Sequence, residues 1–354
     1  MNIGKIPVNA LKRSVLGQIK TKREEAWAGA GIGKDCGGLW FPPDGRLASC
    51  VQEAVLCPPG PPPRDAADSF MTLADLVQKC ANNLAACGSE PVAVMIVLFL
   101  PEGTQELCVK ALMAQAEGKC RELNMQIVGG QTRVCGCAGQ VMAAVTGYGR
   151  VLREGRHTYC AEPGQDVVLS KWIGLQGTAV IARRNRDRLL ERYPAYLVEE
   201  AVNFDRYLSV VPEAGLAAEA GVGAMHDASE GGVLAALWEL AEGAGVGLEI
   251  DMRKLPLRQE TVEVCECCNV NPYELLSGGC LVMTAPDGQG LVRVLEAARI
   301  PARIVGKVTD KNSRILVNGD EIRYMDRPRQ DSVYGARNEG PAEGAALSGP
   351  DGMD

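Results

Sequence analysis

The chain has 354 residues, of which 46% are hydrophobic and 23% are charged, and its formal net charge is -7. These proportions are typical of a globular protein, and the length exceeds the roughly 250 to 300 residues at which one hydrophobic core stops growing. The acidic balance, without a basic run, argues against a nucleic-acid partner. No apolar run reaches the ~18 to 20 residues of a membrane helix, and the N-terminus lacks a signal-peptide pattern. We therefore expect a two-domain, cytoplasmic protein with no membrane contact.

Residues 1–155 predict a layered α/β domain. An amphipathic helix within residues 1–20, with Asn9 as its cap, precedes a glycine-rich loop from Gly29 to Gly38. A loop with five prolines, Pro58–Asp68, separates the first strand from the next helix. In chain order the expected elements are a strand Leu47–Cys57, a helix opened by a Thr72–Asp75 capping pair and ended by Gly88, a strand Pro91–Leu100, a helix Gln105–Glu122 capped by Thr104, and strands Met125–Val134 and Val141–Gly149.

Residues 160–330 predict a second domain, because the alternation of strands and helices restarts after a connector, Arg150–Gly164. A turn, Gly174–Thr178, is expected before a helix, Ala179–Arg188, and a later helix spans Leu291–Ala298. The expected strands are Val167–Ser170, Val222–Met225, Leu248–Ile250, Cys280–Ala285, Ala302–Val308 and Arg314–Val317. Residues 335–354 offer almost nothing to bury, so we expect them to form a disordered tail.

The densest polar cluster in an apolar neighbourhood is the stretch from Met225 to Gly232, Met-His-Asp-Ala-Ser-Glu-Gly-Gly. It is expected to lie between a buried strand and a helix, with Asp227 or Ser229 capping that helix and its free N–H groups facing an anion. Such a corner favours a phosphate-proximal site. The alternative is that Ser229 is only a cap and His226 is only a buried, hydrogen-bonded histidine.

The 14 cysteines are scattered through the expected strands and helices, which is typical of free thiols acting as small hydrophobes. Two groups stand apart, Cys135 with Cys137 and Cys265 with Cys267 and Cys268. A zinc site would need both groups to converge, and the alternative is that all five are structural thiols. Cys36, in the glycine-rich loop, is expected to be the most reactive thiol.

Four motifs follow one another in the order of one known family. They are the glycine-rich loop that ends in Lys34-Asp35-Cys36, the stretch from Ala81 to Pro91, the run from Ile127 to Thr132, and His226 to Gly232. Over about residues 3–330 the chain resembles the AIR synthase-related (PurM-like) superfamily, and within it the hydrogenase maturation factors and their uncharacterised relatives. The resemblance implies an α/β (α+β) fold with an N-terminal four-stranded sheet domain that dimerises and a C-terminal mixed sheet flanked by helices.

The resemblance also implies ligands and partners. In such proteins ATP and magnesium lie in a cleft between the domains, and ATP phosphorylates an amide or carbamoyl oxygen that then leaves as phosphate. The implied partners are a second copy, the nucleotide and another maturation protein. The residues carried over are Gly31, Gly33, Asp35, Asn82, Asn83, Gly129, Gly130, Thr132 and Arg133 for the cofactor, Asp35 and Asp227 for the metal, and Asp227, His226 and Glu230 for catalysis.

The sequence departs from the family pattern at these places. Val51 stands where relatives carry an aspartate, Asn83 replaces a ligand carboxylate, and Arg133 lies where an acid or histidine is usual. Gln176 stands in the place of a glutamate, and no cysteine follows Cys280 to carry the carbamoyl group at the C-terminus. Two hypotheses follow: an ATP-dependent amide- or carbamoyl-activating enzyme weakened by lost acids, or a non-catalytic, dimeric nucleotide- or partner-binding relative with a degenerate magnesium site.

Overall fold

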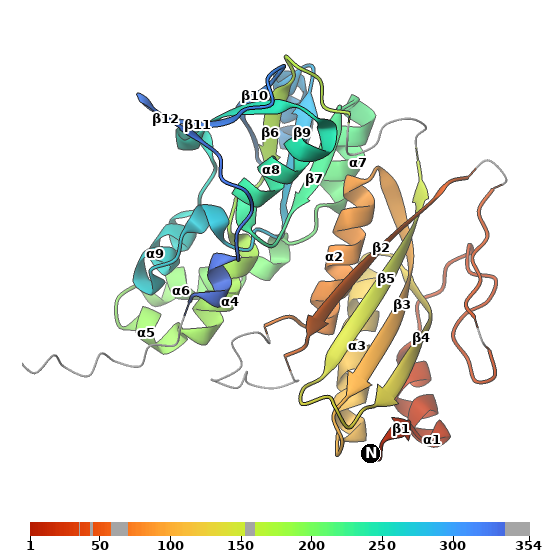
Figure 1. Cartoon of the computed structure of the whole chain (residues 1–354). Coiled ribbons are helices and arrows are strands. Elements are labelled where there is room, and N and C mark those ends of the chain that lie inside the picture. The colour runs from red at the N-terminus through yellow and green to blue at the C-terminus, as the bar shows by residue number, and fades with distance from the viewer. Residues whose placement is uncertain (35, 43–44, 58–69, 153–159, 337–354) are drawn as a thin grey trace, which may run out of the picture.

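The computed structural model describes residues 1–34, 36–42, 45–57, 70–152 and 160–336. The expected proline-rich loop, Asp35 and the expected tail beyond Ala336 lie outside the described residues. Two β-sheets, each covered by helices, make up the structure (Figure 1). Among the described helices, none combines the length and the apolar composition needed to cross a membrane.

The first sheet has the strand order β1-β4-β3-β5-β2. Its strands are β1 (Gly4–Lys5), β2 (Leu47–Val55), β3 (Ser89–Leu100), β4 (Gln126–Val134) and β5 (Met142–Val151). β3 and β4 run parallel and the other pairs are antiparallel, so the sheet is mixed. The four expected strands are confirmed, and β1 adds a two-residue edge beside β4.

One face of this sheet is covered by α2 (Leu73–Ala86) and α3 (Glu106–Glu122), as Figure 1 shows. Alternate β3 residues from Val94 to Leu100 are buried against them. The capping pair is confirmed, since Thr72 and Asp75 each accept the other's backbone N–H. Thr104 is not a cap: its hydroxyl donates to the carbonyl of Pro101, and the N-cap of α3 is Gln105.

The first helix is less regular than expected. α1 (Val8–Ala10) continues as a π-helical turn, Leu11–Val15, and a 3₁₀ turn, Leu16–Gln18. Asn9 lies inside α1 and not at its cap, because the N-cap position is Pro7. Leu11, Val15 and Ile19 nevertheless pack against the core, as their spacing predicts.

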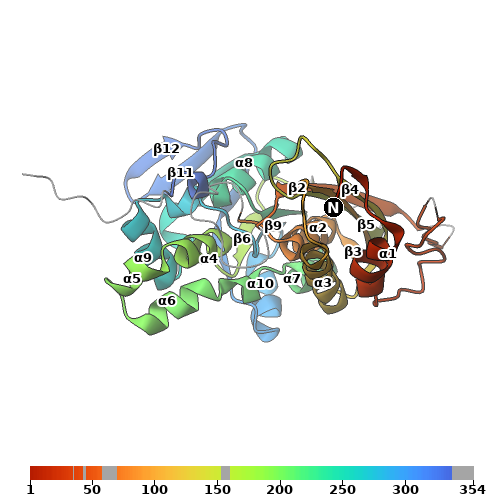
Figure 2. The same cartoon turned by 90° about the horizontal axis from the view of Figure 1, so that it is seen from below.

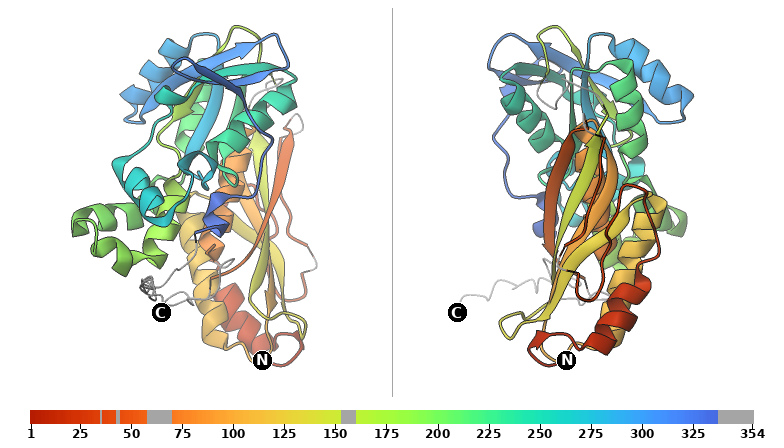
Figure 3. Two further views of the ribbon diagram at one scale, coloured as in Figure 1. Left: turned by 60° about the vertical axis from the view of Figure 1, so that its left-hand side comes forward. Right: turned by 90° about the vertical axis from the view of Figure 1, so that its right-hand side faces the viewer.

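The other face of the first sheet is covered only in part. Ala26, Leu39 and Phe41 pack over buried residues of β3 and β4, and the segment that carries them runs beside the sheet in Figure 3. Further along this face, side chains of β2, β3 and β5 are open to solvent: Val51 is 58% exposed, Phe99 39% and Met142 43%. The N-terminal sheet therefore carries a partly apolar surface that nothing described here covers.

The second sheet has the order β12-β11-β8-β10-β6-β9-β7. Its strands are β6 (Asp166–Ser170), β7 (Ala224–Ala228), β8 (Gly247–Asp251), β9 (Cys280–Ala285), β10 (Ala302–Thr309), β11 (Arg314–Asn318) and β12 (Glu321–Tyr324). Only the β8–β11 pair is parallel among these ladders. The expected mixed sheet is confirmed.

Seven α-helices are described in this half: α4 (Leu175–Arg184), α5 (Arg186–Leu190), α6 (Ala195–Val202), α7 (Val211–Ala220), α8 (Gly232–Ala244), α9 (Gln259–Cys268) and α10 (Gly288–Ala297). Single 3₁₀ turns lie at Phe204–Tyr207, Met252–Lys254, Pro272–Glu274 and Ser332–Tyr334. α7 lies between α10 and α2 of the first half (Figure 2), so it forms part of the junction between the two halves.

Two expectations for this half are wrong. α4 begins at Leu175, so the expected Gly174–Thr178 turn is mostly its first helical turn, and Gly174 takes the N-cap with a φ of 72°. β7 begins two residues later than expected and runs through His226 and Asp227. The packed chain continues to Ala336, which is buried, and the disordered tail beyond it stays a prediction. The domain bounds 1–155 and 160–330 stay predictions.

Candidate functional site

A cavity of about 120 Å³ lies beside the outer edge of β4. β1 pairs only with residues 133 and 134 of that strand, so its first half is left to be covered by other segments. The N-terminal helical turns and the glycine-rich loop supply that cover. The polar and glycine positions among the lining residues are Gly31, Lys34, Gly37, Gly129, Gly130, Gln131 and Thr132.

Glycine is required at two of these positions. A Cβ atom at Gly130, whose φ is 145°, would lie 1.9 Å from the carbonyl oxygen of Ile96. One at Gly37 would lie 2.5 Å from the carbonyl oxygen of Val128. Gly37 therefore lets the returning arm of the loop press against β4, and Gly130 lets β4 approach its neighbour β3 closely beside the cavity.

The cavity brings together Gly31, Gly129, Gly130 and Thr132 from the predicted cofactor set. Gly33 lies in the same loop at a φ of 74°, and Lys34 N–H closes a turn on the carbonyl of Gly31 at 3.3 Å. Lys34 also lines the cavity, although the glycine pattern alone did not single it out; its place directly after Gly33 was the available signal.

The other cofactor residues of the first half lie elsewhere. Arg133 is exposed and, in the described structure, is not part of the cavity lining. Asn82 is buried in α2: its Oδ1 accepts Val210 N–H at 3.0 Å, and its Nδ2 donates to the carbonyl of Leu208 at 2.8 Å. These bonds join α2 to the second half of the chain, so the amide serves a domain junction. Asn83 beside it is half-buried. Roles of both asparagines and of Arg133 in nucleotide binding stay predictions.

Asp227 is the most unusual group of the second half. It is 7% exposed, and neither carboxylate oxygen has a hydrogen-bond partner among the described residues. Burial raises the pKa of Asp227 to about 7 against the smaller opposing effects of His226, Lys79 and Lys171. Nearby, Lys171 forms a 2.6 Å ion pair with Glu213. A buried carboxyl without a partner is suited to a ligand or to proton transfer.

The three predicted catalytic residues do not converge. Successive side chains of a strand point to opposite faces, so His226 and Asp227 lie on different sides of β7. His226 Nε2 is 2.9 Å from Glu239 Oε2 on α8, whereas Asp227 faces the side of α2. Glu230 is exposed. β7 also lies beside α2, away from the β4 edge with its cavity (Figure 1), so the predicted set divides into two groups.

The expected anion corner at the N-terminus of α8 is closed by a carboxylate of the chain itself. Neither Asp227 nor Ser229 caps this helix; the N-cap is Gly231, and its N–H donates to Asp331 Oδ2 at 2.7 Å. Asp331 also accepts N–H groups of Leu276 and Val333. Burial raises the pKa of Asp331 to about 6, although these bonds oppose the rise. Nothing near Asp331 in the sequence indicates its contact with Gly231, because the two residues are 100 positions apart.

The cavity fits a phosphate group better than a magnesium ion. Lys34 and backbone amides are anion ligands, whereas Mg²⁺ prefers carboxylate oxygens. In the described part of the chain, no three His, Cys, Asp or Glu side chains form a group able to hold a metal ion. Of the cysteines considered for a zinc site, Cys265 and Cys267 are buried in α9 and Cys137 is exposed in the first half.

The two mixed sheets, the glycine-rich loop on β4 and the buried acid on β7 define a two-domain mixed α/β protein. Residues 61–151 match the N-terminal domain of AIR synthase related proteins, and residues 162–318 match the C-terminal domain. The chain belongs to the AIR synthase-related family. The resemblance expected from the four motifs is thereby confirmed.

Named relatives and solved structures agree with this membership. Carbamoyl dehydratase HypE of Rhodobacter capsulatus is 29% identical over 213 residues, which are 59% of this chain and 60% of that protein. A crystal structure of hydrogenase maturation protein HypE in complex with ATP matches with a TM-score of 0.72 at 19% identity, over 92% of this chain and 96% of that one. A crystal structure of a HypE-HypF complex matches with a TM-score of 0.64 at 20% identity, over 80% of this chain and 90% of that one. At these identities the solved structures establish the shared fold.

Proposed function

We propose that this protein binds ATP and uses it, at a low rate, to activate an amide or carbamoyl oxygen. The observation that carries the proposal is the cavity in which Lys34 and the glycine loop face Gly129 to Thr132. Backbone N–H groups and a lysine are the donors that a polyphosphate needs. The names of the relatives support it, since one is a carbamoyl dehydratase and one solved structure holds ATP.

The volume of the cavity limits which part of a nucleotide the described residues can enclose. Ligand pockets for whole drug-sized molecules measure roughly 300 to 1,000 Å³, whereas this one measures about 120 Å³. We place a phosphate group there, held by Lys34, and the rest of the nucleotide outside it. When bound, ATP supplies the phosphoryl group that turns an amide oxygen into a leaving phosphate.

The low rate follows from the acids that the family resemblance implies for a magnesium site and that this chain lacks. Val51 is exposed and apolar where relatives carry an acid, and Asn83 is neutral. At an effective dielectric of ~20, a unit charge ~4 Å away is worth about 4 kcal/mol. Even after a severalfold discount for solvent, losing such charges would lower magnesium affinity on the order of tens-fold, since ~1.4 kcal/mol is a factor of ten.

The open face of the N-terminal sheet supports a homodimer as the working form. Val51, Phe99 and Met142 expose apolar surface on three neighbouring strands. Pairing with a second copy would remove that surface from water through a self-complementary contact. We expect Phe99→Glu to halve the mass seen by light scattering, whereas Tyr196→Glu, at an exposed aromatic residue of α6, should leave it unchanged. A second maturation protein as partner rests only on similarity to the HypE-HypF structure.

Calorimetry with ATP, with and without magnesium, tests the proposal together with phosphate release in the presence of carbamoyl or amide acceptors. We expect ATP binding that depends little on magnesium, and slow release. Lys34→Ala should weaken ATP binding at least tenfold, whereas Lys12→Ala, an exposed lysine of the adjoining helical turn, should not. Val51→Asp with Arg133→Glu should increase the magnesium dependence. An unmodified protein that binds no ATP at millimolar concentration would overturn the proposal.

The second candidate is a non-catalytic nucleotide-binding relative. The observation that favours it is the separation of the acid-base residues, because His226 bonds Glu239 on one face of β7 while Asp227 lies on the other. In that case Lys34→Ala still weakens ATP binding. With every carbamoyl or amide acceptor, however, the wild type releases phosphate no faster than an Asp227→Asn variant.

A further inference from the structure

The glycine-rich loop is carried on a short two-stranded stem. Trp40 N–H donates to the carbonyl of Glu25 at 2.7 Å, and Ala28 and Gly38 exchange two backbone hydrogen bonds. The described residues between Ala28 and Gly38 belong to the loop whose Gly31 and Lys34 line the cavity. The position of the loop therefore depends on what holds the stem.

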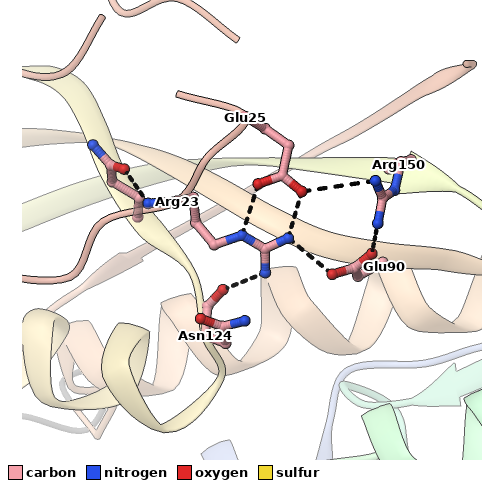
Figure 4. A network of polar contacts seen from close by, with 6 residues as sticks. Arg23, Glu25, Glu90, Asn124 and Arg150 are labelled. Carbon is pink, nitrogen blue, oxygen red and sulfur yellow. Dashed lines mark hydrogen bonds and ion pairs between the residues drawn. The ribbon is translucent and has the colours of Figure 1, made fainter. Parts of the chain in front are cut away.

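The stem is held by an ion network centred on Arg23 (Figure 4). Arg23 binds Glu25 through two hydrogen bonds, from Nε at 2.9 Å and from Nη2 at 2.7 Å. Its Nη2 also donates to Glu90 at 2.9 Å, and its Nη1 to the carbonyl of Asn124 at 2.8 Å. Arg150 completes the network with a 2.5 Å bond to Glu90 and a 3.8 Å contact to Glu25. Glu90 and Arg150 come from β3 and β5, so the network fastens the stem to the sheet.

This network differs from an ordinary surface ion pair. The side chains of Arg23 and Glu25 are 9% and 13% exposed, so solvent screens their attraction little. The bidentate bond from Arg23 lowers the pKa of Glu25 to about 2. Although burial opposes it, hydrogen bonds from Arg23 and Arg150 lower the pKa of Glu90. The network contains two cations and two anions, so it has no net charge. It would therefore affect phosphate binding by positioning the loop and not by attracting the phosphate.

Two contacts transmit the stem position to the loop. Gln126, the first residue of β4, accepts Arg23 N–H at 2.7 Å, and its Nε2 lies 3.0 Å from where a Cβ of Gly29 would be. At the other end of the loop, Gly37 presses on Val128, directly before Gly129 of the cavity. Both ends of the loop are thus set against β4 beside the residues that face Lys34.

We propose that Arg23 is a positioning residue for the nucleotide-binding loop: its bonds to Glu25, Glu90 and Asn124 hold the stem so that Gly31 and Lys34 face Gly129 to Thr132. Arg23 does not line the cavity in the described structure, and it acts through the loop. The expected consequence, weaker ATP binding when Arg23 is replaced, rests on the proposed function. The ordering of the loop by Arg23 can be measured without any nucleotide.

The test uses the full chain with Arg23→Gln, which removes the charge and the fork of donors. Its matched control is Arg13→Gln, which removes a bidentate pair with Glu106 that lies on the surface, where the Arg13 side chain is 64% exposed. Arg23→Lys keeps the positive charge but lacks the forked guanidinium donors, so its loop exchange and ATP affinity should lie between those of the wild type and Arg23→Gln. The readouts are hydrogen exchange of peptides covering Trp27 to Lys34, ATP affinity by calorimetry, and the urea midpoint of unfolding.

In Arg23→Gln we expect exchange in the loop peptides to rise at least tenfold while peptides of α2 keep wild-type exchange, and we expect ATP affinity to fall at least tenfold. Arg13→Gln should change neither. Unchanged loop exchange in Arg23→Gln overturns the inference, and so does a loosened loop that binds ATP as tightly as the wild type. A fall in affinity matched by faster exchange throughout the protein would show a general loss of stability and would also overturn it. If the wild type binds no ATP, the proposed function fails, and loop exchange still decides whether Arg23 holds the loop.

Discussion

Asp331 accepts the backbone N–H of Gly231 at 2.7 Å, although the two residues are 100 positions apart. The same carboxylate accepts N–H groups of Leu276 and Val333, so one side chain joins the N-terminus of α8, the turn before β9 and the last described 3₁₀ turn. Val333 and Ala336 are buried in a cluster with residues of α4, α6 and α9. The end of the described chain is therefore a structural clasp of the second half.

Truncation distinguishes this clasp from the residues that follow it. Ending the chain after Gln330 removes Asp331, Val333 and Ala336, and leaves buried N–H groups without acceptors, each at a cost of about 1 to 3 kcal/mol. We expect the melting temperature to fall by several degrees. Ending it after Ala336 keeps the clasp, and we expect no change. Equal melting temperatures for the two truncations, measured by circular dichroism, would contradict the role given to the clasp.

Stability should depend on pH through Asp331. Its pKa is about 6 in the folded chain and about 3.9 in an unfolded one, so the folded state holds the proton more tightly. The stabilisation is fully present below pH ~4 and is lost as the pH rises to about 6, by roughly 3 kcal/mol in all. Urea unfolding at pH 4.5 and 7 measures the change. Asp331→Asn should reduce the difference between the two pH values, and the part that remains is expected from Asp227, whose pKa is also raised by burial. A variant with the wild-type difference would exclude Asp331 as a source of it.

Asn82 should matter more for the junction between the halves than its neighbour in the helix. Asn82→Ala removes the acceptor of Val210 N–H and the donor to Leu208, so we expect a loss of roughly 2 kcal/mol in unfolding free energy. Asn83→Ala, at a half-buried position of the same helix, serves as the control and should cost less than ~1 kcal/mol. Chemical denaturation of both variants checks the ranking, and equal losses would argue against the junction.

Thiol reactivity should follow exposure and thiolate character. Cys36 and Cys137 are exposed, so native alkylation should modify them first. Burial raises the pKa of Cys120, Cys265 and Cys280 to about 12 in each case. These three should stay unmodified until the protein unfolds, as mass spectrometry can show. Protection of Cys265 that disappears on adding a chelator would instead point to a bound metal.

Local sequence patterns determined much of the fold. The Thr72–Asp75 box marks the start of α2 because both partners of a capping box lie within one helical turn. The apolar run Pro91–Leu100 predicts β3, and helices cover one face of this strand while Phe99 on the other face is 39% exposed. Gly37 and Gly130 also mark the candidate site, since only residues without a side chain allow the loop to approach Val128 of β4 and β4 to approach Ile96 of β3 so closely.

Only the tertiary structure decided which polar residues meet. His226 and Asp227 are adjacent in sequence, yet the alternation of β7 sends one to Glu239 and leaves the other buried without a partner. Asp331 accepts the N–H of Gly231 where an anion was expected to bind, and Asn82 forms hydrogen bonds with Leu208 and Val210. Arg23 fastens the glycine loop through Glu90 and Arg150, far from it in the chain. Sequence spacing fixes local geometry within a few residues, whereas these contacts join distant segments and depend on how the two sheets and their helices pack.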